Sequence, residues 1–153
     1  DKHISFYLLL IGNGLLSGNI KKIVKKSPLK DNIIFTGYRS DSLGLVKNSS
    51  LFVLSSIYGE AICKSVIEAM SLSVAPVITD IPGNRGLVMD GESGLVVPRK
   101  NPEAIANAIN YMYRNDDKRK LMAEAAKKRM EREYNIEDTI EKILSFYKKL
   151  AEK

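Results

Sequence analysis

Residues 51–70 have the sequence LFVLSSIYGEAICKSVIEAM. The first four residues form an uncharged apolar run, which is typical of a strand buried on both faces of a parallel sheet. Apolar residues at helical spacing then predict a helix over residues 62–72. A buried strand followed by a loop and a helix is the βα unit of open α/β folds. Such folds bind ligands at the carboxyl ends of their strands, so the loop at 55–61 is the first place to look for a site.

The same alternation of short apolar runs and longer helical patterns extends over the whole chain. It predicts an α/β fold with a Rossmann-like parallel sheet and flanking helices. The expected strands are Phe6–Ile11, Ile33–Thr36, Leu51–Leu54, Pro76–Thr79 and Leu95–Val97. The expected helices cover 18–27, 41–48, 62–72, a short segment at 84–89, 102–114, 117–132 and 136–151. The start at 102 is well marked, because Asn101 can cap the helix and Pro102 suits its first position.

Length and composition exclude several classes of protein. The chain has 153 residues, 44% hydrophobic and 27% charged, which predicts one ordinary globular domain rather than a disordered or fibrous chain. One cysteine, Cys63, and one histidine, His3, argue against a disulfide framework and against His/Cys metal chemistry. The longest apolar run is far shorter than the roughly 20 residues that a membrane-spanning helix needs. The start at Asp1 has no signal-peptide pattern, and we expect the sequence to begin inside a longer protein.

The formal net charge of +6 favours anionic ligands in a general way. Four lysines fall at helical spacing around apolar positions, and they most simply form the solvated face of an amphipathic helix: Lys21, Lys22, Lys25 and Lys26. Nucleic-acid binding is the weaker interpretation, because no aromatic residues are interleaved with these lysines to stack on bases.

Two carboxylates, Glu60 and Glu68, stand eight positions apart around the expected start of a helix. Eight helical residues span at most about 12 Å. The free amides at a helix N-terminus favour an anion, so the arrangement suits a phosphate group with hydroxyl groups on either side, as in a nucleoside diphosphate sugar. Alternatively, Glu60 caps the helix and Glu68 is a solvated helical residue. Spacing alone favours this second interpretation, although the apolar neighbours of Glu68 count against it.

The E-x7-E pattern at 60–68 is accompanied by further motifs in a fixed order, and together they resemble a known family. These motifs are Leu10-Ile11-Gly12-Asn13-Gly14, Ile34-Phe35-Thr36-Gly37-Tyr38, Pro76-Val77-Ile78-Thr79-Asp80 and Gly91-Glu92-Ser93-Gly94-Leu95-Val96-Val97-Pro98. The chain resembles the retaining nucleotide-sugar glycosyltransferases of family 4, which have the two-domain GT-B fold. The resemblance covers residues 1–153 and implies the C-terminal, donor-binding half of such an enzyme.

The resemblance also implies roles for particular residues. Glu68 is expected to bind the ribose hydroxyls, and Glu60 to contact hydroxyls of the transferred sugar as the catalytic residue. The remaining donor-binding residues are the stretch at the diphosphate, Ala61, Ile62, Cys63 and Lys64, the strand-to-helix turn, Gly12 and Gly14, and the loop at the nucleobase, Gly37, Tyr38 and Arg39. Ala61 departs from the family, which usually has glycine close after the first glutamate, and Pro82-Gly83 replaces a common pair of glycines. The Arg and Lys that neutralise the diphosphate in the family are expected to precede residue 1.

The expected function is transfer of a sugar, with retention, from a nucleotide diphosphate sugar to a hydroxyl acceptor in polysaccharide or glycolipid biosynthesis. We expect no cofactor, no metal and no nucleic-acid partner. By the resemblance, a missing N-terminal domain binds a saccharide or lipid-linked acceptor, so this chain alone is inactive. The full protein is expected in the cytoplasm, with peripheral membrane association. Two alternatives stay open: a non-catalytic nucleotide-binding module, and a basic α/β interaction domain that uses residues 21–26.

Two weaker interpretations concern further residues of the expected site. Asp80, Asn84 and Arg85 follow the fourth expected strand, and they either line the ligand cleft or act as turn and cap residues. Cys63 lacks a nearby histidine partner in the sequence and is expected to be a small packing residue.

Overall fold

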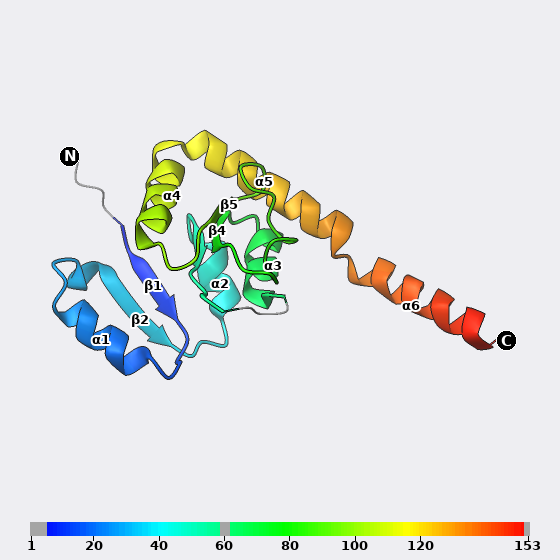
Figure 1. Cartoon of the computed structure of the whole chain (residues 1–153), viewed down its shortest axis with the longest axis horizontal. Coiled ribbons are helices and arrows are strands. Elements are labelled where there is room, and N and C mark those ends of the chain that lie inside the picture. Colours follow the sequence, from blue (N-terminus) through cyan, green and yellow to red (C-terminus); the bar gives the residue numbers. More distant parts are fainter. Residues whose placement is uncertain (1–5, 59–61, 152–153) are drawn as a thin grey trace. The chain divides into compact units, whose positions relative to one another are not determined.

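The computed structural model describes residues 6–58 and 62–151 (Figure 1). The chain divides into two compact units, Asp1–Ser42 and Leu43–Lys153, and each is described by itself. Both are built from parallel strands and helices, which confirms the expected α/β class. The expectation of a single domain stays a prediction.

The first unit is one βαβ crossover. It contains β1 (Leu8–Ile11), α1 (Ser17–Lys25), the short 3-10 helix η1 (Lys30–Asn32) and β2 (Ile33–Gly37). The two strands are parallel, with Leu8 opposite Ile33, and a shift in register after Leu10 places Ile11 opposite Gly37. None of the described residues of this unit is fully buried, because a two-stranded sheet with one helix cannot enclose its apolar side chains.

The second unit contains a three-stranded parallel sheet in the order β3-β4-β5. Its elements are α2 (Ser42–Lys47), β3 (Phe52–Leu54), α3 (Lys64–Ser71), β4 (Pro76–Thr79), β5 (Leu95–Val97), α4 (Pro102–Arg114), α5 (Asp116–Glu133) and α6 (Ile136–Ala151). All four residues of the central strand β4 are buried. This burial explains its continuous apolar sequence, because a central strand covered on both faces needs no alternation.

The core of the second unit consists of two clusters that share β4 and α5. The first contains Cys63, Val66, Met70, Ile78, Leu87, Val88, Ala126 and Met130, and the second contains Ala75, Val77, Val97, Ala108, Met112, Met122 and Ala123. Neighbouring residues of β4, Val77 and Ile78, belong to different clusters, as the pleat of a strand requires. Helix α3 therefore packs with the first cluster and α4 with the second.

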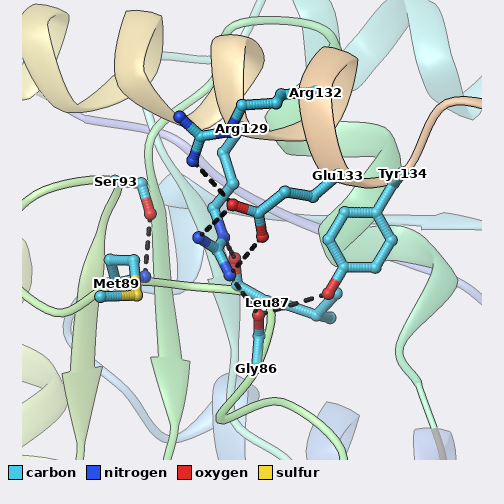
Figure 2. Close-up of polar contacts among 8 residues, drawn as sticks. All are labelled: Gly86, Leu87, Met89, Ser93, Arg129, Arg132, Glu133 and Tyr134. Carbon is cyan, nitrogen blue, oxygen red and sulfur yellow. Dashed lines mark hydrogen bonds and ion pairs between the residues drawn. The ribbon is translucent and has the colours of Figure 1, made fainter.

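The segment after β4 is fixed to the end of α5 by side-chain hydrogen bonds (Figure 2). Arg129 donates to the carbonyl oxygens of Leu87 at 3.0 Å and Gly86 at 2.8 Å, and the Tyr134 hydroxyl donates to Gly86 at 3.3 Å. The helix expected at 84–89 is wrong: residues 82–87 form successive turns. Glycine is a poor helix former, and the carbonyls of Gly86 and Leu87 are bonded by side chains of α5.

Helix α6 buries none of its residues within the described structure. Its apolar side chains, which include Ile140, Leu144 and Phe146, are all about half exposed or more. No helix within residues 6–58 and 62–151 is both long and apolar enough to cross a membrane.

Candidate functional site

The loop after β3 and the start of α3 form the centre of the candidate site. Helix α3 begins at Lys64, two residues later than expected, because Cys63 has an extended backbone (φ −83°, ψ 104°) and serves as the N-cap. No side chain caps this helix. The first amides of a helix have no intrahelical acceptor and carry its positive dipole end, so the start of α3 offers hydrogen-bond donors to an anion.

Glu68 lies one turn inside α3, on its partly exposed side. Its side chain is 32% exposed, and its Oε1 lies 3.3 Å from Nζ of Lys64, whose side chain is 87% exposed. Buried residues of α3, including Val66 and Met70, fix the opposite face of the helix in the core. Glu68 is therefore neither buried nor freely solvated, and in this structure it is paired with a lysine of the first helical turn.

Two of the expected donor residues at this loop cannot be placed. Glu60 and Ala61 lie outside the described residues. Ile62 is 58% exposed, whereas Cys63 is buried in the first core cluster with its Sγ 3.1 Å from Oγ of Ser65. The burial of Cys63 confirms that its side chain packs in the core.

Thr79, at the end of β4, holds the loop after β3 in place. Its buried hydroxyl donates to the carbonyl oxygen of Ser56 at 2.6 Å. The sequence interpretation did not single out this residue, although a hydroxyl at the end of an otherwise apolar buried run was a detectable signal. This hydrogen bond ties the end of β4 to the first residues after β3.

A second cluster of polar residues, Asp80, Arg85 and Arg99, lies at the carboxyl ends of β4 and β5. The Asp80 amide donates to the carbonyl oxygen of Val97 at 2.7 Å. The Asp80 carboxylate accepts from Nε of Arg85 at 2.5 Å and from its terminal nitrogen at 2.9 Å. These hydrogen bonds, assisted by the charges of Arg85 and Arg99, lower the pKa of Asp80 below its ordinary value. The three side chains line an open hollow of about 340 Å³ together with Pro82 and Pro98.

Asn84, in the turns after β4, is completely buried. Its backbone amide donates to the carbonyl of Ile81 at 2.9 Å, as expected for a turn residue. Its side-chain oxygen and nitrogen have no hydrogen-bond partner among the described residues. Asn84 therefore does not line the hollow, whereas Asp80 and Arg85 do.

In the first unit, the structure brings together the two loops that follow β1 and β2. The Gly12 amide donates to the carbonyl oxygen of Gly37 at 2.8 Å. Both glycines have positive φ, 123° and 66° respectively, a backbone conformation that glycine adopts without strain. Gly14 accepts hydrogen bonds from the amide and hydroxyl of Ser17 at the start of α1. The turn expected at Gly12 and Gly14 is therefore confirmed.

The loop after β2 presents an exposed aromatic residue and a paired arginine. Tyr38 is 83% exposed. Arg39 donates two hydrogen bonds to the Asp41 carboxylate, at 2.7 and 2.6 Å, and this contact lowers the pKa of Asp41. The guanidinium of Arg39 is thus paired within its own loop.

Over the described part of the chain, no three His, Cys, Asp or Glu residues gather closely enough to hold a metal ion. The polar groups described above are the amides at the start of α3, the half-buried Glu68, and two arginine–aspartate pairs that follow parallel strands. These groups lie at the carboxyl ends of parallel strands, the edge at which open α/β folds bind ligands.

Comparison with known proteins gives the family. Residues 1–129 match the family described as glycosyl transferases group 1, and the chain belongs to it. The chain has the fold of the C-terminal domain of GT-B glycosyltransferases.

Individual relatives agree with this assignment. The chain is 28% identical over 148 residues to an uncharacterised glycosyltransferase of Methanocaldococcus jannaschii, covering 95% of this chain and 36% of that protein. It is 26% identical over 141 residues to the UDP-Gal:alpha-D-GlcNAc-diphosphoundecaprenol alpha-1,3-galactosyltransferase of Escherichia coli, covering 91% and 36%. A crystal structure of a glycosyltransferase from Rickettsia africae superposes with a TM-score of 0.89 at 26% identity, covering 98% and 41%. The chain thus spans about two fifths or less of the length of these relatives.

Proposed function

We propose that this chain is the donor-binding half of a retaining, family 4 glycosyltransferase that uses a nucleotide diphosphate sugar. The observation that carries the proposal is the start of α3: an uncapped helix N-terminus at the carboxyl end of a parallel sheet, with Glu68 one turn further on. The E. coli relative, whose name gives UDP-Gal as donor, supports a nucleotide-sugar substrate.

In this proposal each residue has a separate task. The amides of Ile62, Cys63 and Lys64 bind the diphosphate and stabilise the charge that develops on it as the sugar leaves. Glu68 accepts hydrogen bonds from the ribose hydroxyls, and Glu60 accepts them from the transferred sugar. The loop at Gly37, Tyr38 and Arg39 contacts the nucleobase through its backbone, and the turn at Gly12 and Gly14 lets the chain approach the ligand closely. No cofactor or metal takes part.

In this proposal the contact between Lys64 and Glu68 opens when the donor binds. Lys64 occupies a carboxylate oxygen that the ribose needs, and its ammonium lies on the first turn of α3. On donor binding, we expect Lys64 to turn from Glu68 towards the diphosphate. This exchange would free Glu68 and add a positive charge beside the phosphates, where electrostatics favour it.

The acceptor belongs to the remainder of the proposed enzyme. We propose that a domain preceding these residues binds a saccharide or lipid-linked acceptor, so that the chain alone transfers no sugar. The E. coli relative, named for a diphosphoundecaprenol-linked acceptor, supports a role in polysaccharide or glycolipid biosynthesis. A lipid-linked acceptor would place the full protein in the cytoplasm, at the inner face of a membrane.

Calorimetric titration of the full-length protein with UDP, GDP and their sugars tests the donor site. Glu68→Ala should weaken nucleotide binding by about 1.5 to 3 kcal/mol, because a charged hydrogen-bond acceptor is lost. Glu60→Ala should leave the free nucleotide bound and impair sugar transfer by the full-length enzyme. Glu124→Ala, an exposed glutamate of α5, is the matched control and should bind like the parent.

Three outcomes separate this proposal from the alternatives. Unchanged binding of every donor by Glu68→Ala would contradict the ribose assignment. Nucleotide binding without sugar transfer by the full-length protein would favour a non-catalytic module. Steeply salt-dependent RNA binding without nucleotide-sugar affinity would favour a basic interaction domain.

A chelator should leave donor affinity nearly unchanged, and loss of binding restored by magnesium would contradict the metal-free site.

A further inference from the structure

The hollow at the carboxyl ends of β4 and β5 is lined by residues other than those assigned to the nucleotide. Its five lining residues are Asp80, Pro82, Arg85, Pro98 and Arg99. They come from two loops that are far apart in sequence. The hydrogen bond from the Asp80 amide to Val97 joins these loops where the two strands end. Pro82 and Pro98 fix the backbone φ angle at one position in each of these loops.

The charges of the lining residues do not cancel. Both carboxylate oxygens of Asp80 are bonded by Arg85. Among the described residues, Arg99 has no hydrogen bond or ion pair of its own, although its charge acts on Asp80. Two guanidinium groups and one carboxylate leave a net positive charge, which a bound anion would balance.

A purely structural role explains this cluster poorly. Arg85 is 69% exposed, and an exposed ion pair contributes little to stability. A metal ion is also a poor occupant, because the lining offers one carboxylate whose oxygens are already bonded. Arginine presents a planar set of donors that matches phosphate and carboxylate groups with two parallel hydrogen bonds.

We propose that this hollow is a subsite for the phosphate or carboxylate group of a small acidic ligand other than the nucleotide. Arg99 is its primary ligand. Arg85 is a second arm whose charge Asp80 partly neutralises. The subsite does not depend on the transferase activity proposed above, since its residues are distinct from those around α3.

Titration of the intact protein, saturated with UDP so that the donor site is filled, tests the subsite. The probes are glucose 6-phosphate, glucuronate, inorganic phosphate and, as the neutral control, glucose. We expect one or more of the three anionic probes to bind and glucose not to bind. The comparison between phosphate and carboxylate probes shows which of the two groups the subsite prefers. If UDP itself fails to bind, the nucleotide assignment fails, while the anion titration still reports on the hollow.

Three variants are expected to change the affinity for the anionic probe in different ways. Arg99→Gln should weaken binding of the anionic probe by about tenfold or more, because a charge-assisted contact is lost. Arg114→Gln removes the same charge about 18 Å along α4 from its first residue and should change nothing. Asp80→Asn should tighten binding several-fold, because it frees the guanidinium of Arg85 and removes the negative charge.

Each variant is first checked by thermal unfolding, so that a loss of folding is not mistaken for a loss of binding. No binding of any anionic probe at millimolar concentration would overturn the proposal. Equal binding by the parent and a folded Arg99→Gln would do the same. Weaker or unchanged binding by a folded Asp80→Asn would assign Asp80 and Arg85 to turn structure alone and contradict the second arm.

Discussion

Lys64 and Glu68 are the residues whose pairing can be tested most directly. Their contact is exposed, so its loss should cost little stability. Lys64→Gln removes a positive charge beside the proposed diphosphate but also frees Glu68 for the ribose. We expect the loss of charge to dominate, with UDP affinity reduced a few-fold, by about 1 kcal/mol.

Salt provides the control for the Lys64 prediction. In the parent, added salt should weaken UDP binding by screening the lysine charge, and Lys64→Gln should show a smaller salt dependence. Calorimetry at two ionic strengths measures both slopes. Equal slopes would mean that Lys64 does not face the diphosphate.

The contact between Asp80 and Arg85 fixes the sign with which folding stability depends on pH. The folded-state pKa of Asp80 is lowered from 3.8, first by the Arg85 hydrogen bonds. A group with a lowered pKa adds stability above its unfolded pKa and loses it as the pH falls through the folded value. The difference in Tm between the parent and Asp80→Asn should therefore be constant above about pH 5 and shrink below pH 3.8. A difference that grows on acidification would contradict the ion pair.

Arg129 joins α5 to the turns after β4 (Figure 2). A substitution of Arg129 therefore tests how much this contact between elements stabilises the fold. Its side chain is 16% exposed and bonds two backbone carbonyls as well as Glu133. Arg129→Met should lower the free energy of unfolding by about 1 to 3 kcal/mol, because those carbonyls lose a charged donor.

The matched control for Arg129 is Arg132. It pairs with the same glutamate, but its side chain is 74% exposed and it makes no contact with the turns among the interactions of the described residues. Arg132→Met should cost less than about 1 kcal/mol. Urea unfolding measures the loss of stability in the two variants. Equal losses would show that the shared contact with Glu133, rather than the hydrogen bonds of Arg129 to the turns, accounts for both.

The elements that could be predicted from sequence are those whose local signals agree with their burial. Strand β4 was predicted to the residue because all its side chains enter the core. Helix α4 was also predicted to the residue, and Asn101 accepts from the Ala104 amide as its cap should. The segment 84–89 was mispredicted because its apolar residues suit a helix, whereas long-range bonds from Arg129 decide its conformation.

The contacts of the candidate site likewise fall into those that the sequence predicts and those that depend on tertiary packing. The Lys64–Glu68 contact follows from i,i+4 spacing on a helix and was within reach of the sequence. The pairing of Asp80 with Arg85 depends on the turns between them, and the approach of Arg99 depends on the alignment of β4 with β5. The complete burial of Asn84 also arises from tertiary packing. No periodicity in the sequence encodes these contacts.

At the scale of the whole molecule, the sheet of each unit has edges that are unpaired within residues 6–58 and 62–151. Within the described residues, β1 has β2 as its ladder partner, and β3 has β4. A doubly wound sheet has the strand order 3-2-1-4-5-6, and the family resemblance makes β1 its second strand. The observed orders are β1-β2 in the first unit and β3-β4-β5 in the second.

We propose that a further strand, from the rest of the protein or from another chain, pairs with the edge of β1 that is unpaired within the described residues. Expressed by itself, the 153-residue chain should be unstable or prone to association, because unpaired edges invite pairing with other chains. It should also transfer no sugar. An upstream extension that contains the strand should raise Tm and restore donor binding, as measured by thermal unfolding and calorimetry.

The matched control is the same extension with proline in the middle of the added strand. Proline removes a ladder hydrogen bond and is excluded from central strands, so this variant should behave like the unextended chain. If both extensions stabilise equally, the added residues act by some means other than sheet completion. A monomeric, stable 153-residue chain with full transferase activity would contradict both the missing strand and the division of the enzyme into donor and acceptor halves.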